Sequence, residues 1–184
     1  SRKEVKSALS DAIDEQKKFH SDIRRMGNEV LSAIDADPEC LATVLFGRPY
    51  NSFTSIANKG IPEKFASRGV RIIPFDMLPY EDETLDTDQN MYWGMGRMIL
   101  QGASYVKKKE KMFGAYITNF SCGPDSFLVG YFRDIMGRKP SLTLLVLKPA
   151  LKRFWILPDI IGKSKKENRL MLKETILSRQ KLRP

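Results

Sequence analysis

Apolar residues recur every three or four positions along the first 35 residues, with charged and polar side chains between them. This spacing places the apolar side chains on one face of a helix. The sequence therefore predicts a long N-terminal amphipathic helix, which we assign to residues 1–37. Its apolar positions are Val5, Leu9, Ala12, Ile13, Phe19, Ile23, Met26, Val30 and Ile34.

From residue 38 onward, short apolar runs alternate with helical patterns. The runs predict buried strands at residues 41–46, 70–73, 112–118 and 142–147. The helical patterns lie at residues 62–68, 89–109 and 124–136, and the last has Pro124 in its first turn and Gly137 at its end. This alternation predicts an α/β fold. We expect residues 38–147 to form a Rossmann-like open parallel sheet of about four strands with flanking helices.

Two loops that follow predicted strands carry candidate chemistry, because open parallel sheets bind ligands beyond the carboxyl ends of their strands. The first loop follows residue 46. In it Gly47 permits a sharp turn, Arg48 can pair with a phosphate or carboxylate, and Tyr50 and Asn51 offer hydrogen bonds. A surface turn with a solvated arginine is the alternative interpretation.

The second loop covers residues 119–126 and contains Asn119, Ser121 and Cys122. A cysteine between a strand end and a helix start favours the thiolate form, because the helix dipole and free N–H groups stabilise negative charge. Such a thiolate suits a nucleophile or a metal ligand, and a half-buried structural cysteine is the alternative. One thiolate does not hold an iron–sulfur cluster without others. Cys40 lies at the opposite end of its strand, where we expect it to serve packing.

Several other signals favour structural roles. Gly94 and Gly96 lie inside a helical pattern and lack the third glycine of a dinucleotide fingerprint, which favours helix packing. His20 is the single histidine, so a Ser-His-Asp or Cys-His apparatus within this chain is disfavoured. Asp76 suits either a ribose contact or a turn. The acidic residues at 81–88 are irregularly spaced, so we expect them to be solvated rather than metal-binding.

The charge of the chain is concentrated near its C-terminus. The 184 residues carry a net charge of +9. Residues 1–147 hold 20 Lys and Arg against 19 Asp and Glu, whereas residues 148–184 hold 11 against 3. Because most of the chain is nearly neutral and lacks a recognition motif, binding to nucleic acid is disfavoured. Two cysteines, no apolar run of membrane-spanning length and no secretory signal predict a soluble, cytoplasmic protein.

Three stretches carry a resemblance to a known family. They are Leu45–Asn51 (LFGRPYN), Asn58–Glu63 (NKGIPE) and Thr118–Phe127 (TNFSCGPDSF). Together they resemble the large proteins related to the activators of 2-hydroxyacyl-CoA dehydratases, within the region similar to the dehydratase component. The resemblance covers about residues 1–144, and the cysteine-containing stretch is its most specific part. We therefore expect this chain to be a fragment of a longer polypeptide.

The resemblance implies a [4Fe-4S] iron–sulfur cluster held by cysteines from several such domains. It also implies low-potential electron transfer to an acyl-CoA-type substrate, powered by ATP hydrolysis in an activase module or subunit. By motif match Cys122 is the expected metal ligand. The other candidate cofactor-binding residues are Gly47, Arg48, Tyr50, Asn51, Asn119 and Ser121. The implied partners are the activase, other dehydratase-like domains and an acyl-CoA, without a membrane. The chain alone, part of a lyase system, is expected to be inactive.

A second function class stays open at this point. In it the domain is a non-catalytic scaffold that binds the phosphates of an acyl-CoA or a nucleotide through Arg48 and the neighbouring loop.

The basic tail, residues 148–184, departs from the family pattern. With one choice of allowed codons, Leu145–Trp155 reads in a shifted frame as Gly-Ile-Glu-Thr-Arg-Ile-Lys-Ala-Phe-Leu, which resembles the helix that the family has there. We hypothesise that a deletion with a frameshift near residue 144 makes the tail out-of-frame and not native to the family. Sequencing the gene across this junction tests the hypothesis.

Overall fold

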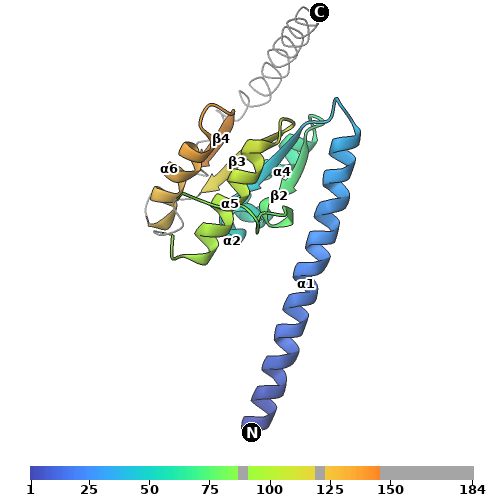
Figure 1. Cartoon of the computed structure of the whole chain (residues 1–184), viewed down its shortest axis with the longest axis vertical. Helices are drawn as coiled ribbons and strands as arrows, with labels where there is room; N and C mark the ends of the chain where they lie inside the picture. Colours follow the sequence, from blue (N-terminus) through green and yellow to red (C-terminus); the bar gives the residue numbers. More distant parts are fainter. Residues whose placement is uncertain (87–90, 119–122, 146–184) are drawn as a thin grey trace, which may run out of the picture. The chain divides into compact units, whose positions relative to one another are not determined.

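A computed structural model describes residues 1–86, 91–118 and 123–145 (Figure 1). The described strands form one parallel sheet in the order β2-β1-β3-β4. They are β1 (Ala42–Phe46), β2 (Arg71–Pro74), β3 (Met112–Thr118) and β4 (Ser141–Leu145). The Rossmann-like α/β prediction is therefore confirmed, and the strand bounds differ from the predicted ones by at most two residues; residues 146–147 of the fourth predicted strand lie outside the described residues.

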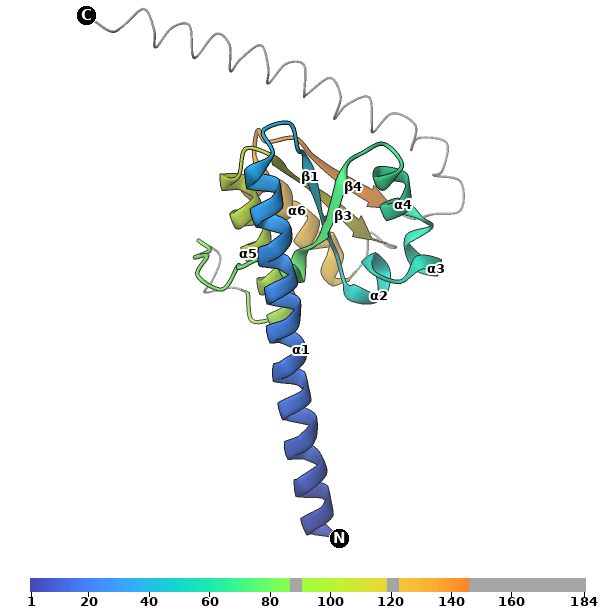
Figure 2. The same cartoon turned by 90° about the vertical axis from the view of Figure 1, so that its right-hand side faces the viewer.

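The two central strands, β1 and β3, are buried along their whole length. Their nearly continuous apolar sequences suit a parallel sheet whose two faces are both covered. On one face α5 (Gly94–Lys108) and α6 (Pro124–Met136) pack, and the Phe132 ring of α6 lies against Phe46 and Tyr116. The short helices α2 (Pro49–Ser52), α3 (Ser55–Asn58) and α4 (Ile61–Ala66) lie on the other side (Figure 2).

The predicted N-terminal helix is α1 (Arg2–Ala36). Its second half packs on the domain: Ile34 is buried, and Gly27 lies against η1 (Phe75–Met77). A Cβ atom at residue 27 would lie 2.0 Å from the Met77 carbonyl oxygen, so only glycine permits this approach. Residues 1–22 are all exposed, and both views show the first half of α1 extending past the other elements (Figures 1 and 2).

The helix predicted at residues 89–109 begins later than expected. Within its described part, residues 91–93 are not helical and α5 starts at Gly94. Met91 is nevertheless buried, although it lies in a non-helical segment. Its spacing from the buried residues of α5 therefore imitates the pattern of a longer helix. Gly96 does serve packing as predicted, because a Cβ atom there would lie 2.9 Å from both Met91 and Trp93. The predicted loop after β1 contains the helical turns α2 and α3.

Within the described residues, none of the helices combines the length and the apolar content that crossing a bilayer requires.

Candidate functional site

The sheet order identifies where a ligand would bind. The chain passes from β1 to β2 on one side and then returns to place β3 on the other side of β1. The connections that leave β1 and β3 therefore run in opposite directions. This is the switch point at which open parallel sheets bind ligands, and we call the region beyond the carboxyl ends of these two strands the crevice. Both loops that the sequence singled out follow these two strands, so the topology brings them to the same edge of the sheet.

Gly47 makes the turn at the end of β1. Its φ is +130°, a conformation that other residues rarely adopt. A Cβ atom there would lie 2.3 Å from Ser52 Oγ and 2.4 Å from the Ile117 carbonyl oxygen. Glycine is needed because the backbone passes directly against the end of β3.

Arg48 and Asp125 form an ion pair between the two loops. Arg48 Nη2 donates to Asp125 Oδ2 at 2.9 Å. Thr118 Oγ1 donates to the same oxygen at 2.7 Å, and the Tyr116 hydroxyl donates to Asp125 Oδ1 at 3.3 Å. The Asp125 side chain is fully buried. One carboxylate on the first turn of α6 is thus bound to the end of β3 and to the loop after β1.

Electrostatics favour the protonated form of the Tyr116 phenol. Burial, together with the charge of Asp125 and its hydrogen bond, raises the pKa of Tyr116 well above its usual range. The phenol therefore stays protonated at neutral pH and donates to the carboxylate. The sequence made Arg48 a candidate to pair with a phosphate or carboxylate, and within the chain it pairs with the Asp125 carboxylate; its contact with a ligand stays a prediction. Sequence reasoning did not single out Asp125, and its place three residues after Cys122 in the TNFSCGPDSF stretch is the signal that could have found it.

The remaining predicted residues of the first loop face different surroundings. Tyr50 is exposed, and the Arg48 guanidinium lies 4.9 Å from its ring centroid. Asn51 is buried, and its backbone N–H donates to the Arg48 carbonyl at 2.8 Å. Asn51 therefore lies inside the loop and Tyr50 at its surface.

The predicted residues of the second loop, Asn119, Ser121 and Cys122, lie outside the described residues. The described chain stops at Thr118, the last residue of β3, and resumes at Gly123, the N-cap of α6. Cys40 is a buried core residue, in agreement with its predicted packing role.

The family stretch at residues 58–63 has a structural role in the loop after β1. Asn58 is buried, and its Nδ2 donates to the Ser52 carbonyl at 3.0 Å. Its Oδ1 accepts from the Gly60 N–H at 3.0 Å. The Asn58 side chain therefore links α2 to the start of α4 and stabilises the loop that carries Gly47 and Arg48.

A pocket of about 540 Å³ lies beside the crevice, between α1 and the carboxyl ends of β1 and β2. Arg24 of α1 lies 4.9 Å above the Tyr80 ring and pairs with Glu81. Asp76 also lines the pocket, where burial raises the pKa of its carboxyl group against the opposing effects of a backbone hydrogen bond and of Arg24. The described residues show Asp76 in η1, in agreement with the turn interpretation; its ribose contact stays a prediction.

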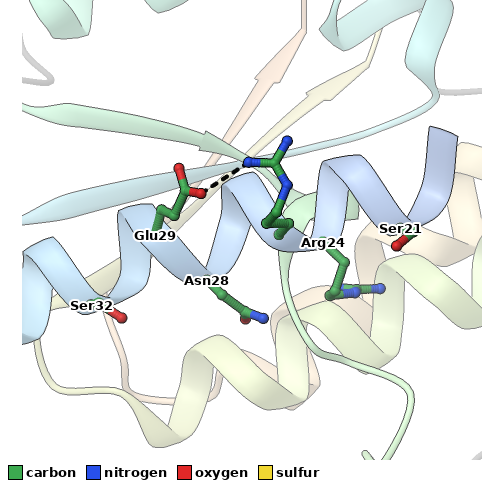
Figure 3. Close-up of a pocket in the computed structure, with 6 residues that line it drawn as sticks. Ser21, Arg24, Asn28, Glu29 and Ser32 are labelled. Carbon is green, nitrogen blue, oxygen red and sulfur yellow. Dashed lines mark hydrogen bonds and ion pairs between the residues drawn. The ribbon is translucent and has the colours of Figure 1, made fainter. Parts of the chain in front are cut away.

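An open polar hollow runs along α1 itself (Figure 3). It is lined by Ser21, Arg24, Arg25, Asn28, Glu29 and Ser32. Two of these residues, Arg25 and Glu29, form an ion pair at 3.0 Å. Exposed pairs of this kind along a helix are weak and screened by salt. The hollow therefore has the character of a solvated helix surface.

The expectation that the acidic loop is solvated is wrong for one of its residues, Glu83. The Glu83 carboxylate accepts from Ser104 Oγ at 3.1 Å and from Lys108 Nζ at 2.6 Å, and its backbone carbonyl accepts from Gln101 Nε2 at 2.9 Å. Glu83 therefore ties the loop to α5. Across the part of the chain that the structure describes, no group of three or more His, Cys, Asp or Glu side chains is arranged to hold a metal ion.

Comparison with known families adds one finding. The model of the CoA enzyme activase uncharacterised domain (DUF2229) matches residues 1–78. No curated protein and no solved structure matches the chain. The matched residues include α1, β1 and β2, together with the loop that carries Gly47 and Arg48. Residues 1–78 are therefore similar to a CoA enzyme activase-related domain, which supports the family region that the motifs indicated.

Proposed function

We propose that this chain is part of an iron–sulfur protein related to the 2-hydroxyacyl-CoA dehydratases, acting in low-potential electron transfer to an acyl-CoA-type substrate. The observation that carries the proposal is the ion pair at the switch point of the sheet, beyond the carboxyl ends of β1 and β3. There the Arg48–Asp125 pair ties the loop after β1 to the helix that directly follows the Cys122 segment. The family match over residues 1–78 supports the same assignment.

By motif match Cys122, which lies outside the described residues, would supply one thiolate, and other domains or subunits would supply the remaining ligands. Among the described residues, Arg48 favours such a cluster. Arg48 Nε is buried and has no hydrogen-bond partner among the described residues. A buried N–H donor without an acceptor favours a ligand that accepts hydrogen bonds, as cluster sulfurs do. When bound, the cluster would supply one-electron transfer.

The role of the chain's own residues is positioning. Gly47 lets the loop pass against the end of β3, and Asp125 orients the Arg48 guanidinium. Because Asp125 and Arg48 neutralise each other, the crevice does not present a full positive charge. The proposed partners are an ATP-binding activase and other dehydratase-like domains, in a reducing cytoplasm that keeps the thiolate free.

Anaerobic reconstitution with iron and sulfide tests the proposal. Dithiothreitol is included, since a chain with one ligand needs additional thiols. We expect charge-transfer absorbance in the wild type and in Cys40→Ala, a matched loss of the other, buried cysteine, but not in Cys122→Ala. No absorbance in the wild type, or equal absorbance in Cys122→Ala, would contradict the cluster role.

The alternative scaffold function rests on Arg48 as a phosphate ligand. Arg48 Nε, which has no hydrogen-bond partner within the described part of the chain, and the neighbouring exposed Tyr50 favour it, whereas the pairing of Arg48 with Asp125 opposes it. Calorimetric titration with coenzyme A and with inorganic pyrophosphate separates the two functions. Binding that is lost in Arg48→Ala but kept in Cys122→Ala would support the scaffold.

A further inference from the structure

The apolar face of α1 continues past the domain that it covers. Positions 27, 30 and 34 pack on the domain. Positions 9, 12 and 16 each lie 18 residues earlier, which is five whole turns of a helix, so both sets lie on the same face. The same face of the helix is therefore covered in its second half and uncovered in its first half. Packing on the domain does not require the uncovered half to be apolar.

The uncovered half has the pattern of a coiled-coil seam. Its side chains are separated by four and three residues in alternation, which is the 3.5-residue repeat of supercoiled helices. We call these positions the N-terminal stripe; they are Val5, Leu9, Ala12 and Gln16, and the next position, Phe19, lines the pocket between α1 and the domain. Val5 is 68% exposed, Leu9 60% and Phe19 54%, and neighbouring Ile13 is 46% exposed. Apolar side chains in this regular order fit a second helix better than a flat surface.

We propose that the N-terminal stripe pairs with the same stripe of a second copy of this chain, with the two helices running in opposite directions. The direction follows from the domain, which occupies the continuation of the stripe at Gly27 and Ile34. A parallel second copy would bring its own domain to the same place. An antiparallel copy carries its domain at the far end of the pair.

The side chains of the seam complement each other in this arrangement. Leu9 lies opposite Ala12 of the second copy, and Val5 lies opposite Gln16. Because the large Leu9 side chain meets a small one, the two helices can approach closely at the centre of the seam.

The positions that flank the seam add no repulsion. Lys6 faces Ile13 of the second copy and Glu15 faces Ala8, so no like charges meet across the seam. Residues 1–20 hold five Lys and Arg against four Asp and Glu, so this half of the helix carries little net charge. Two copies can therefore approach without electrostatic repulsion between these segments.

The size of the contact sets the expected affinity. Residues 5–19 span about 22 Å at 1.5 Å per residue. A seam of about four helical turns is short, which places the contact at the weak end of specific interfaces, so the dimer should depend on concentration. We expect it to form in the micromolar range.

Sedimentation equilibrium of the 184-residue chain from about 10 to 500 μM tests the pairing, a range chosen for weak interfaces. Leu9→Glu should weaken association about tenfold or more, because it buries a charge in the seam. Ser7→Glu adds the same charge on the opposite face of the helix, 200° from Val5, and should leave association unchanged. Circular dichroism checks that both variants keep α1.

Disulfide trapping tests the direction. In a Cys122→Ala background, Leu9→Cys and Ala12→Cys variants are mixed and oxidised. The antiparallel pair predicts that the mixed disulfide forms faster than either homodimer. A chain that stays monomeric, equal effects of Leu9→Glu and Ser7→Glu, or faster trapping of Leu9→Cys with itself would overturn the proposal. The stripe would then belong to a partner of different sequence, such as the activase module.

Discussion

Replacing Arg48 by alanine should destabilise the domain strongly, because it leaves Asp125 as a buried charge without its cation. The Asp125 side chain is 0% exposed and that of Arg48 18%. Breaking a buried ion pair by removing one partner costs about 3–5 kcal/mol. Asp125 keeps hydrogen bonds from Thr118 and Tyr116, so we place Arg48→Ala near the lower end, at about 3 kcal/mol.

Urea unfolding measures this loss as a lower midpoint with an unchanged slope. In a thermal scan the same loss corresponds to a melting temperature lower by about 6–12 °C for a chain of this size. Arg138→Ala serves as a matched control, because Arg138 is exposed and its loss should change the stability by less than about 0.5 kcal/mol.

A double-mutant cycle separates the pair from the individual side chains. Arg48→Ala with Asp125→Ala should be less destabilised than the sum of the two single variants, because neither charge is then left alone. A loss below about 1 kcal/mol in Arg48→Ala, or additive effects in the cycle, would refute the coupling of the two loops through this pair.

Three further outcomes are expected. Gly47→Ala should cost about 3 kcal/mol or more, because its Cβ would meet backbone and hydroxyl oxygens, whereas Gly69→Ala, with a positive φ but open space, should cost about 1 kcal/mol. Gly27→Ala should displace α1 from η1 and speed amide exchange in both, as measured by mass spectrometry, because its Cβ would lie 2.0 Å from the Met77 carbonyl oxygen. Burial lowers the pKa of Lys139 to about 8 from 10.5. Between these pH values the unfolded chain binds more protons, so the stability of the wild type relative to Lys139→Met should rise from pH 8 to 10.

Each of these expectations has an opposite result that contradicts it. Equal urea midpoints for the Gly47 and Gly69 variants would show that the close contact at the end of β1 does not exclude a side chain at residue 47. Unchanged exchange in η1 would show that α1 tolerates a side chain at residue 27. A difference between wild type and Lys139→Met that is flat with pH would mean that Lys139 keeps its proton.

Most of the fold follows from local pattern, and the exceptions have identifiable causes. The bounds of β3 and α6 agree with the prediction, because continuous apolar runs and the Pro124 and Gly137 signals are local properties. The start of α5 was wrong, since burial of Met91 from an extended segment imitates helical spacing. Glu83 was expected in solvent, because nothing in the sequence shows that Ser104 and Lys108 lie beside it.

The sequence by itself determined the α/β class, the long first helix and the two loops that follow β1 and β3, because periodicity and turn chemistry act over a few residues. Only the tertiary structure decided that Arg48 pairs with Asp125, 77 positions away, and that Gly27 touches η1. Strand order brings these residues together, and strand order depends on the packing of the whole domain. The same packing covers one half of the α1 face and leaves the N-terminal stripe exposed. The spacing of the stripe positions is nevertheless the same in the two halves.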